Sequence, residues 1–181
     1  SGAAEYTESQ SEYTGGGKLA LGVDIGGSHI ACKVVELGSS RPVGETYTEV
    51  KIAENESAQK ILAAWDSALG ACMQKAGARA ITGLGVAMPS PFDFIKGIAM
   101  AEHKFASIKG MNVRAELHRL TGIDPSRILF TNDAAGFGMG AWSLGGGNAR
   151  HLIGVTLGTG FGACFIVDGC YATYGPGVPI G

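Results

Sequence analysis

Two stretches of this 181-residue chain repeat one another, and the repeat limits the range of folds more than any other feature. Aligned without gaps, residues 21–35 (LGVDIGGSHIACKVV) and 153–167 (IGVTLGTGFGACFIV) are identical at six positions. The identical pairs are Gly22 and Gly154, Val23 and Val155, Gly26 and Gly158, Ala31 and Ala163, Cys32 and Cys164, and Val35 and Val167. Each stretch is an apolar run, a glycine-rich turn and a second apolar run, which predicts a strand, a tight turn and another strand.

The residues after the first copy predict a sheet of mixed strand direction. Strands are expected at 18–24, 29–37 and 43–52, with a turn at 38–42, so that they form an antiparallel meander. Helical spacing of apolar residues then predicts a helix between Ser57, a preferred N-cap, and Gly77, a preferred stop. The next expected elements are a strand at 80–88, a long loop at 89–110, a helix at 113–121 ended by Gly122, and a strand at 127–131. Because two helical crossovers return the chain to the meander, the predicted fold class is α/β, a mixed sheet with flanking helices.

The second copy predicts that the fold begins again. A helical stretch at 133–142 precedes expected strands at 151–157, 163–167 and 170–173. By the symmetry of the repeat, residues 18–145 are expected to form a first lobe. Residues 146–181 are expected to be only the start of a second lobe, with its remainder absent. Residues 1–17 are polar and end in glycine, so we expect a flexible tail there.

The composition of the chain limits which binding partners and which cellular compartment are expected. A formal net charge of −2 gives no reason to expect nucleic acid as a partner, so a bound phosphate would be held by backbone amides. Glycine makes up 30 of 181 residues, more than twice the usual ~7%, without a fibrous period, so these glycines are expected where the backbone requires them. Cys32, Cys72 and Cys164 lie in apolar segments and are expected to be reduced core residues. The sequence shows no membrane-length apolar run and no signal-peptide pattern, so we expect a cytoplasmic protein without a membrane partner.

The two glycine turns predict a site for a phosphate chain. Glycine brings amide N–H groups against an anion without an intervening Cβ. Asp24 precedes the first turn, where it would hold a divalent cation, and Ser28 offers a hydroxyl donor. In the second copy Thr156 takes the place of the acid, and Thr159 lies within the turn. The alternative is that both copies are plain tight hairpins in which Asp24 only favours the turn.

Asn132 and Asp133 form a second candidate site. They follow the buried strand expected at 127–131 and precede a helix, which is a usual place for ligand contacts in α/β proteins. An exposed carboxylate there could accept a proton from an alcohol. Capping of the helix by either residue is the alternative explanation.

The other polar residues predict no further site. Four histidines, His29, His103, His118 and His151, show no spacing typical of metal ligands and are expected at the surface or in turns. Arg114 and Arg119 are expected on a solvated helix face.

Four motifs, in their order and spacing, resemble those of the ROK sugar kinases, within the actin, hexokinase and heat-shock ATPase superfamily. They are LGVDIGGSHI, GVAMPSP, TNDA and GVTLGTGFG, and the resemblance runs from Leu19 to the end of the chain. It implies a duplicated ribonuclease H-like fold around a cleft, with the turns at 24–28 and 158–162 as two phosphate loops. The residues implied to contact the nucleotide phosphates or their metal are Asp24, Gly26, Gly27, Ser28, Thr156, Gly158, Thr159 and Gly160.

The resemblance also implies a reaction, the ATP-dependent phosphorylation of a hexose by a glucokinase-like enzyme with Mg²⁺ near Asp24. Asp133 matches the catalytic base of the family, and Asn132 matches a ligand of the sugar hydroxyls. The further residues expected at the sugar are Ser90, Glu102 and His103. Ser90 stands where the family has glycine, and Ala135 stands where it often has asparagine.

Partners and missing parts are implied by the same resemblance. It implies a homodimer for the full-length protein, and a zinc site only beyond Gly181. The 181-residue chain alone is expected to bind ATP poorly and to be inactive, because the adenine pocket is not within it. A sugar-responsive ROK regulator or a non-catalytic sugar-binding protein remains an alternative, and the sequence does not identify the hexose or the hydroxyl that accepts phosphate.

Overall fold

The computed structural model describes residues 17–39, 41–53, 55–77, 79–102, 105–145, 147–157 and 161–172. Its strands, in chain order, are β1 (Leu19–Gly26), β2 (His29–Glu36), β3 (Arg41–Pro42), β4 (Thr48–Lys51), β5 (Ile81–Met88), β6 (Phe92–Asp93), β7 (Ile98–Ala99), β8 (Ile128–Asn132), β9 (His151–Leu157), β10 (Phe161–Val167) and β11 (Cys170–Tyr171). Its helices are α1 (Ala58–Ala76), α2 (Val113–Thr121) and α3 (Asp133–Leu144), with short 3-10 turns η1 (Ala106–Ile108) and η2 (Pro125–Arg127). Except for Gly17, the expected tail lies outside the described residues.

A six-stranded sheet of mixed direction forms the main body, as the sequence predicts. Its order is β3–β2–β1–β5–β8, and β4 also pairs with β2. β1 and β2 run antiparallel, from Leu19 opposite Glu36 to Gly26 opposite His29. β5 runs parallel to both β1 and β8. The parallel pairs need crossovers, and α1 and α2 lie in those connections.

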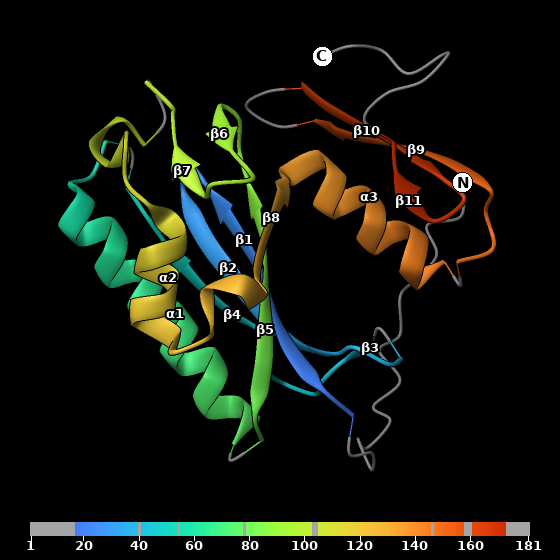
Figure 1. The fold of residues 1–181 in the computed structure, drawn as a ribbon, viewed down its shortest axis with the longest axis horizontal. Coiled ribbons are helices and arrows are strands. Elements are labelled where there is room, and N and C mark those ends of the chain that lie inside the picture. The colour runs from blue at the N-terminus through green and yellow to red at the C-terminus, as the bar shows by residue number, and fades with distance from the viewer. Residues whose placement is uncertain are drawn as a thin grey trace.

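Helices α1 and α2 lie on one face of the main sheet (Figure 1). Because side chains alternate along a strand, every second residue of β1, β2 and β5 points to this face. Those residues are large, apolar and buried: Leu21, Val23, Ile25, Ile30, Val34, Leu84, Val86 and Met88. Trp65 and Leu69 of α1 are fully buried against them. The predicted helix boundaries are confirmed, since Ser57 Oγ accepts from Lys60 N and Gly77 is the C-cap.

The opposite face of the main sheet is built mostly from glycine and alanine. In the pairing of β1 with β5, Gly22 lies beside Gly85 and Asp24 lies beside Ala87. α3 comes close to this face, since a Cβ added at Gly136 would lie 3.2 Å from Cβ of Ala87. The small side chains therefore leave room above the sheet and allow α3 to approach its edge.

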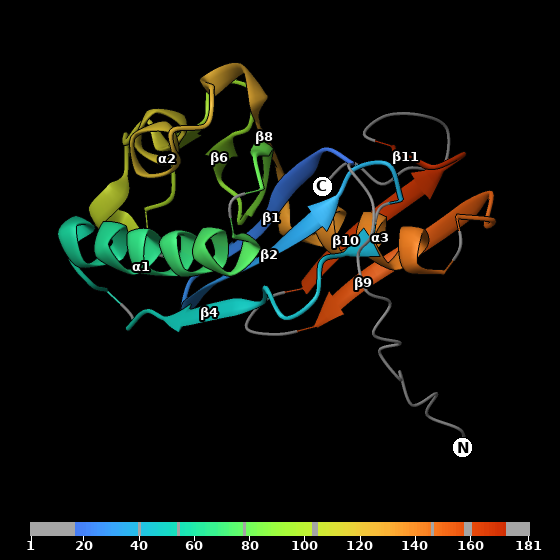
Figure 2. The ribbon, with the colours of Figure 1, turned by 90° about the horizontal axis from the view of Figure 1, so that it is seen from below.

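β9, β10 and β11 form a separate three-stranded antiparallel sheet, which is the second copy predicted from the repeat. α3 packs on it through Gly138, where an added Cβ would overlap Sγ of Cys164. α3 thus lies between the two sheets and contacts both. In Figure 2, α1 lies beside β4 on the side of the molecule remote from β11. Within the described ranges, no helix is both long and apolar enough to cross a membrane.

Two stretches differ from the sequence expectation. The strand expected at 43–52 is shorter, β4, and β3 lies within the turn expected at 38–42. Between them Thr46 is buried, its Oγ1 donating to Val43 O at 2.7 Å and accepting from Val34 N at 3.1 Å. This side-chain hydrogen bond takes the place of a backbone ladder contact, so the strand is interrupted there. The loop expected at 89–110 contains the β6–β7 hairpin and η1.

The expectation of a solvated face for Arg114 is wrong. Its guanidinium donates to the backbone carbonyls of three residues, Ile95, Pro125 and Ile128. Five N–H donors on one planar group satisfy carbonyls that turns leave without a ladder partner. Arg119 does lie at the surface as expected, paired with Glu116 at 2.9 Å.

Candidate functional site

Three neighbouring parallel strands, β1, β5 and β8, end at one edge of the main sheet. Across these strands Asp24 is in register with Ala87, and Ala87 is in register with Thr131. Asn132 is the last residue of β8, and Asp133 is the first residue of α3. The topology therefore brings Asp24 and Asp133 to the same edge from distant positions in the sequence. The carboxyl ends of parallel strands are where open α/β sheets bind ligands.

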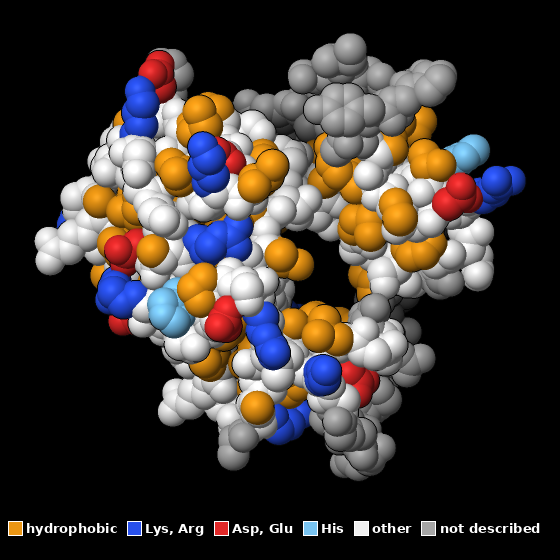
Figure 3. Space-filling view, in the orientation of Figure 1, with side chains coloured by type: hydrophobic (Ala, Val, Ile, Leu, Met, Phe, Trp, Pro, Cys, Tyr) orange, Lys and Arg blue, Asp and Glu red, His pale blue; other side chains and the backbone are white. Residues whose placement is uncertain are grey.

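A cleft of about 770 Å³ opens over this edge and over the glycine-rich face. The polar side chains along it are Asp24, His29, Lys33, Tyr47, Thr131 and Asp133. Its floor and walls include glycine, alanine and a few large apolar residues, among them Gly22, Gly85, Ala87, Leu129, Gly136 and Phe137. Figure 3 shows a hollow between the main sheet with its helices and the region of α3 and β9–β11. Both predicted carboxylates therefore lie on one cavity.

Asp24 forms an ion-pair contact with His29 at the start of β2. Asp24 Oδ2 lies 3.2 Å from His29 Nε2, and the side chains are 51% and 33% exposed. A Cβ added at Gly26 would lie 2.7 Å from Cε1 of His29, so glycine leaves the room that the imidazole occupies. His29 was not among the predicted site residues. Its place opposite Gly26 in the hairpin register is the signal that would have indicated it.

Asn132 and Asp133 both contact the start of α3 through their side chains. Asn132 is the N-cap of α3, since its Oδ1 accepts from Ala134 N at 3.0 Å. Its Nδ2 donates to Ser90 Oγ at 3.2 Å, so two of the predicted sugar residues are in contact. Asp133 is exposed, and its Oδ1 also accepts from Ala134 N, at 2.8 Å. Among the described residues its other oxygen has no hydrogen-bond donor, so that oxygen is open to a ligand.

Of the other predicted residues, Gly26 lines this cleft, whereas Ser28 and Glu102 are not among the residues that line it. Glu102 is exposed and its Oε1 accepts from Lys109 Nζ at 2.5 Å. His103, Gly158, Thr159 and Gly160 lie outside the described residues, and only the backbone of Thr156 is described, as part of β9. Ser28 is exposed at the end of the first turn, where its carbonyl accepts from Ile52 N at 2.8 Å.

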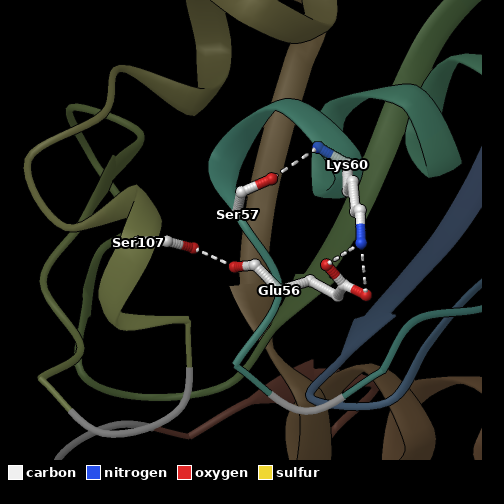
Figure 4. Close-up of polar contacts among 4 residues, drawn as sticks. All are labelled: Glu56, Ser57, Lys60 and Ser107. Carbon is white, nitrogen blue, oxygen red and sulfur yellow. Dashed lines mark hydrogen bonds and ion pairs between the residues drawn. The ribbon is translucent and has the colours of Figure 1, made fainter.

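A smaller hollow of about 90 Å³ lies beside the first turn, with Gly27 in its lining. Figure 4 shows the contacts at its rim, where Glu56 meets both Lys60 of α1 and Ser107 of η1. Ser107 Oγ donates to Glu56 O at 2.7 Å, and Lys60 Nζ lies 3.0 Å from Glu56 Oε2. These contacts join the segment around η1 to the start of α1 near the turn.

Tyr47 lines the cleft and donates a hydrogen bond. Its hydroxyl donates to Glu49 Oε2 at 2.7 Å. This bond is the main cause that raises the pKa of Tyr47, and the negative charge of Asp24 adds to it. Tyr47 therefore stays protonated at neutral pH.

The sequence comparison identifies the family of the chain. The model of the ROK family matches residues 20–178, which include both hairpins and both cleft carboxylates. The chain belongs to the ROK family. The resemblance inferred from the four motifs is thereby confirmed. Among curated protein sequences, no match to this ROK chain is found.

Solved structures of other ROK proteins share the fold. The ROK hexokinase from Thermus thermophilus is 23% identical with a TM-score of 0.65, and the match covers 86% of this chain and 49% of that one. A ROK glucokinase from Streptomyces griseus, in complex with glucose and AMPPNP, is 23% identical with a TM-score of 0.66, over 86% and 46%. A ROK transcriptional regulator, a homologue of the E. coli MLC protein, is 18% identical with a TM-score of 0.64, over 87% and 38%. The chain thus spans about half the length of the first two, and these likenesses establish the fold, an α/β sheet as predicted.

Proposed function

We propose that this ROK chain belongs to an ATP-dependent sugar kinase that phosphorylates a hexose. The observation that carries the proposal is the placement of Asp24 and Asp133 on one cleft, at the carboxyl ends of parallel strands. Transfer of a phosphoryl group to an alcohol needs an acceptor for the hydroxyl proton and a place for the phosphate charge. Membership of the ROK family and the shared fold with a hexokinase and a glucokinase support the same reaction.

Asp133 is the proposed general base. The free oxygen of its exposed carboxylate accepts the proton of the sugar hydroxyl as the hydroxyl oxygen attacks the γ-phosphate of ATP. The hydrogen bond from Ala134 N to Oδ1 fixes the carboxylate at the start of α3. Asn132, held by its bonds to Ser90 and Ala134, is proposed to orient the sugar hydroxyls. Glu102 and His103 are proposed as further sugar contacts.

The turn after β1 is the proposed phosphate site. Its backbone amides at Gly26, Gly27 and Ser28 are proposed to bind phosphate oxygens, together with the turn at 158–160 and Thr156 of the second copy. No group of three or more His, Cys, Asp or Glu that could hold a metal is found among the described residues. A magnesium ion that arrives with the nucleotide needs only one or two protein carboxylates, and exposed Asp24 fits that need. Such an ion offsets the charge of the phosphates when bound.

The domain organisation is proposed to follow the repeat, with residues 18–145 as a first lobe and 146–181 as the start of a second. The packing of α3 between the two sheets supports a boundary near its end. A homodimer and a cytoplasmic location are proposed for the full-length protein.

A panel of hexoses tests the function directly. The full-length protein is incubated with ATP, Mg²⁺ and each sugar, and release of ADP is followed together with the mass of the sugar product. A kinase releases ADP only with particular hexoses and forms a hexose phosphate. A transcriptional regulator is among the similar ROK structures. If this protein is a sugar-responsive regulator instead, calorimetry will detect sugar binding, but no hexose of the panel will cause release of ADP. That result would overturn the proposal.

A further inference from the structure

His29 reaches Asp24 diagonally across the first hairpin. In the pairing of β1 with β2, His29 lies directly opposite Gly26, and Asp24 is two residues before Gly26 on β1. Diagonal neighbours on one face of an antiparallel pair are within reach of an aromatic side chain. The imidazole takes this path, since its Nε2 lies 3.2 Å from Oδ2 of Asp24. A carboxylate only accepts hydrogen bonds, so Nε2 is the donor.

Glycine at position 26 leaves this path open. A Cβ there would lie 2.7 Å from Cε1 and 3.0 Å from Nδ1 of the His29 ring, closer than side chains normally approach. With any larger residue at this position, the imidazole would have to move from its place beside Asp24. Gly26 is thus needed for the contact, apart from its predicted place in the phosphate turn.

The second copy of the repeat replaces both partners of this contact. In the alignment of residues 21–35 with 153–167, Thr156 takes the place of Asp24 and Phe161 takes the place of His29. Threonine carries no negative charge, and phenylalanine has a ring but no N–H donor. The chain therefore has the donor only in the copy that has the acid, which is expected if the two residues act together.

The contact occupies one oxygen of Asp24 and leaves the other open. Within the described part of the chain, His29 is the one side chain that hydrogen-bonds to the Asp24 carboxylate, and Oδ1 has no donor. Both residues line the large cleft. Because both side chains are partly exposed, the ion pair adds little to stability. Its main effect is to hold the carboxylate of Asp24 in one orientation over the cleft.

We propose that His29 is a positioning residue, which orients Asp24 so that its open oxygen supports the metal ion of a metal–nucleotide complex. This inference rests on the proposed function, in which Asp24 supports Mg²⁺. Loss of a side chain that hydrogen-bonds to a metal ligand typically lowers metal affinity or activity by about 10–100-fold. His29 itself contacts neither the sugar nor the transferred proton, so its loss affects metal-dependent nucleotide binding and leaves the KM for the sugar unchanged.

Three substitutions separate the hydrogen bond from the bulk of the ring. His29→Phe keeps a ring beside Gly26 and removes the donor, and phenylalanine is also the aligned residue of the second copy. His29→Gln removes the ring and keeps an amide N–H donor of similar reach. His151→Phe is the matched control, because His151 is an exposed histidine at the start of β9 and is not among the residues that line the cleft.

Calorimetry of AMPPNP binding, with and without Mg²⁺, tests the proposal in the full-length protein. We expect Mg²⁺ to tighten binding to the unsubstituted protein, and this gain to fall about tenfold in His29→Phe. His29→Gln should keep most of the gain, and His151→Phe should keep all of it. The affinity without Mg²⁺ and the melting temperature should not change in any variant. In an Asp24→Asn background, His29→Phe should cause no further loss, since the two residues act through one contact.

An unchanged Mg²⁺ gain in His29→Phe overturns the proposal. An equal loss in His29→Phe and His29→Gln also overturns it, because the ring rather than the hydrogen bond would then matter. So does weaker binding without Mg²⁺, which would place the effect in the phosphate turn. Failure of the proposed function alone looks different: the binding differences remain, but no hexose causes release of ADP. A protein that binds no AMPPNP with Mg²⁺ overturns both.

Discussion

The hairpins β1–β2 and β9–β10 have similar sequences but differ in register by one residue. In the first, Val23 is opposite Cys32, and two residues lie between the paired Gly26 and His29. In the second, the aligned valine is opposite Ala163 rather than Cys164, and three residues lie between the last paired positions, 157 and 161. Because side chains alternate, a slip of one residue moves a whole strand's side chains to the other face. Cys32 and Cys164 are therefore aligned in sequence yet lie on non-equivalent faces.

The two hairpins are also covered on opposite faces. Val23 is 5% exposed beneath α1, whereas Val155 at the aligned position is 45% exposed. Gly22 faces the open cleft, whereas Gly154 lies against α3. A repeat in sequence therefore predicts where the strands lie but not which elements pack on them. An aligned residue is buried in one copy and exposed in the other.

The largest expected difference between the hairpins concerns their acidic residues. Asp24→Asn in the full-length protein should lower the sugar-dependent kcat by about 10–100-fold, the effect typical of weakening the support of a metal site. Asp168→Asn is the matched control, since Asp168 is an exposed turn carboxylate of the second meander, paired with Arg150 at 3.0 Å. Initial rates measured across a series of Mg²⁺ concentrations show the effect. Unchanged rates and Mg²⁺ dependence in Asp24→Asn would leave Asp24 as a turn residue only.

The aligned glycines should respond differently to alanine. A Cβ at Gly154 would lie 2.7 Å from Cys164 Sγ and 3.3 Å from the Gly138 backbone, so Gly154→Ala should cost about 1–3 kcal/mol of unfolding free energy by overpacking. A Cβ at Gly22 has as its nearest atom the Lys33 carbonyl oxygen, at 3.8 Å. Gly22→Ala should therefore change stability by less than about 0.5 kcal/mol. Urea unfolding of both variants checks the pair, and equal losses would contradict the packing of α3 on the second sheet.

The aligned valines should show the smallest difference. Val23→Ala removes buried methyl groups and should cost about 1.5 kcal/mol by the loss of burial. Val155→Ala removes partly exposed ones and should cost less than about 0.5 kcal/mol. Thermal unfolding under one buffer condition measures both. If Val155→Ala lost as much stability as Val23→Ala, that would contradict the exposed position of Val155. It would mean that another part of the protein covers that face of the second sheet.

Features that depend on neighbouring residues in sequence were predictable. The repeat, the buried faces of the strands, and the helix boundaries at Ser57 and Gly77 follow from spacing and capping, and the structure has them. The placement of Asn132 and Asp133 between a strand and a helix was predictable for the same reason. These are local signals, so one sequence is enough to read them.

Features that depend on pairing between distant residues were not predictable. The contact of His29 with Asp24 depends on the register of the hairpin. The inward turn of Arg114 depends on carbonyls that η2, β8 and the β6–β7 hairpin bring near it. The hydrogen bond from the Cys32 thiol to the Ala68 carbonyl depends on how α1 packs on β2. Hydrophobic periodicity shows which residues are buried but not which buried residues meet.

The substitution Asp133→Asn tests the central claim, that Asp133 is the base of a sugar kinase, most directly. Asparagine keeps an Oδ1 acceptor for the N–H of Ala134 and leaves the N-cap, Asn132, in place, so stability should change by no more than about 1 kcal/mol. Loss of the proton acceptor should lower kcat on the best hexose by about 10²–10⁴-fold. The measurement is kcat from ADP release by the full-length protein, with sugar binding by calorimetry as the control for folding. A near-normal kcat in Asp133→Asn would contradict the account and leave Asp133 as a helix-end residue.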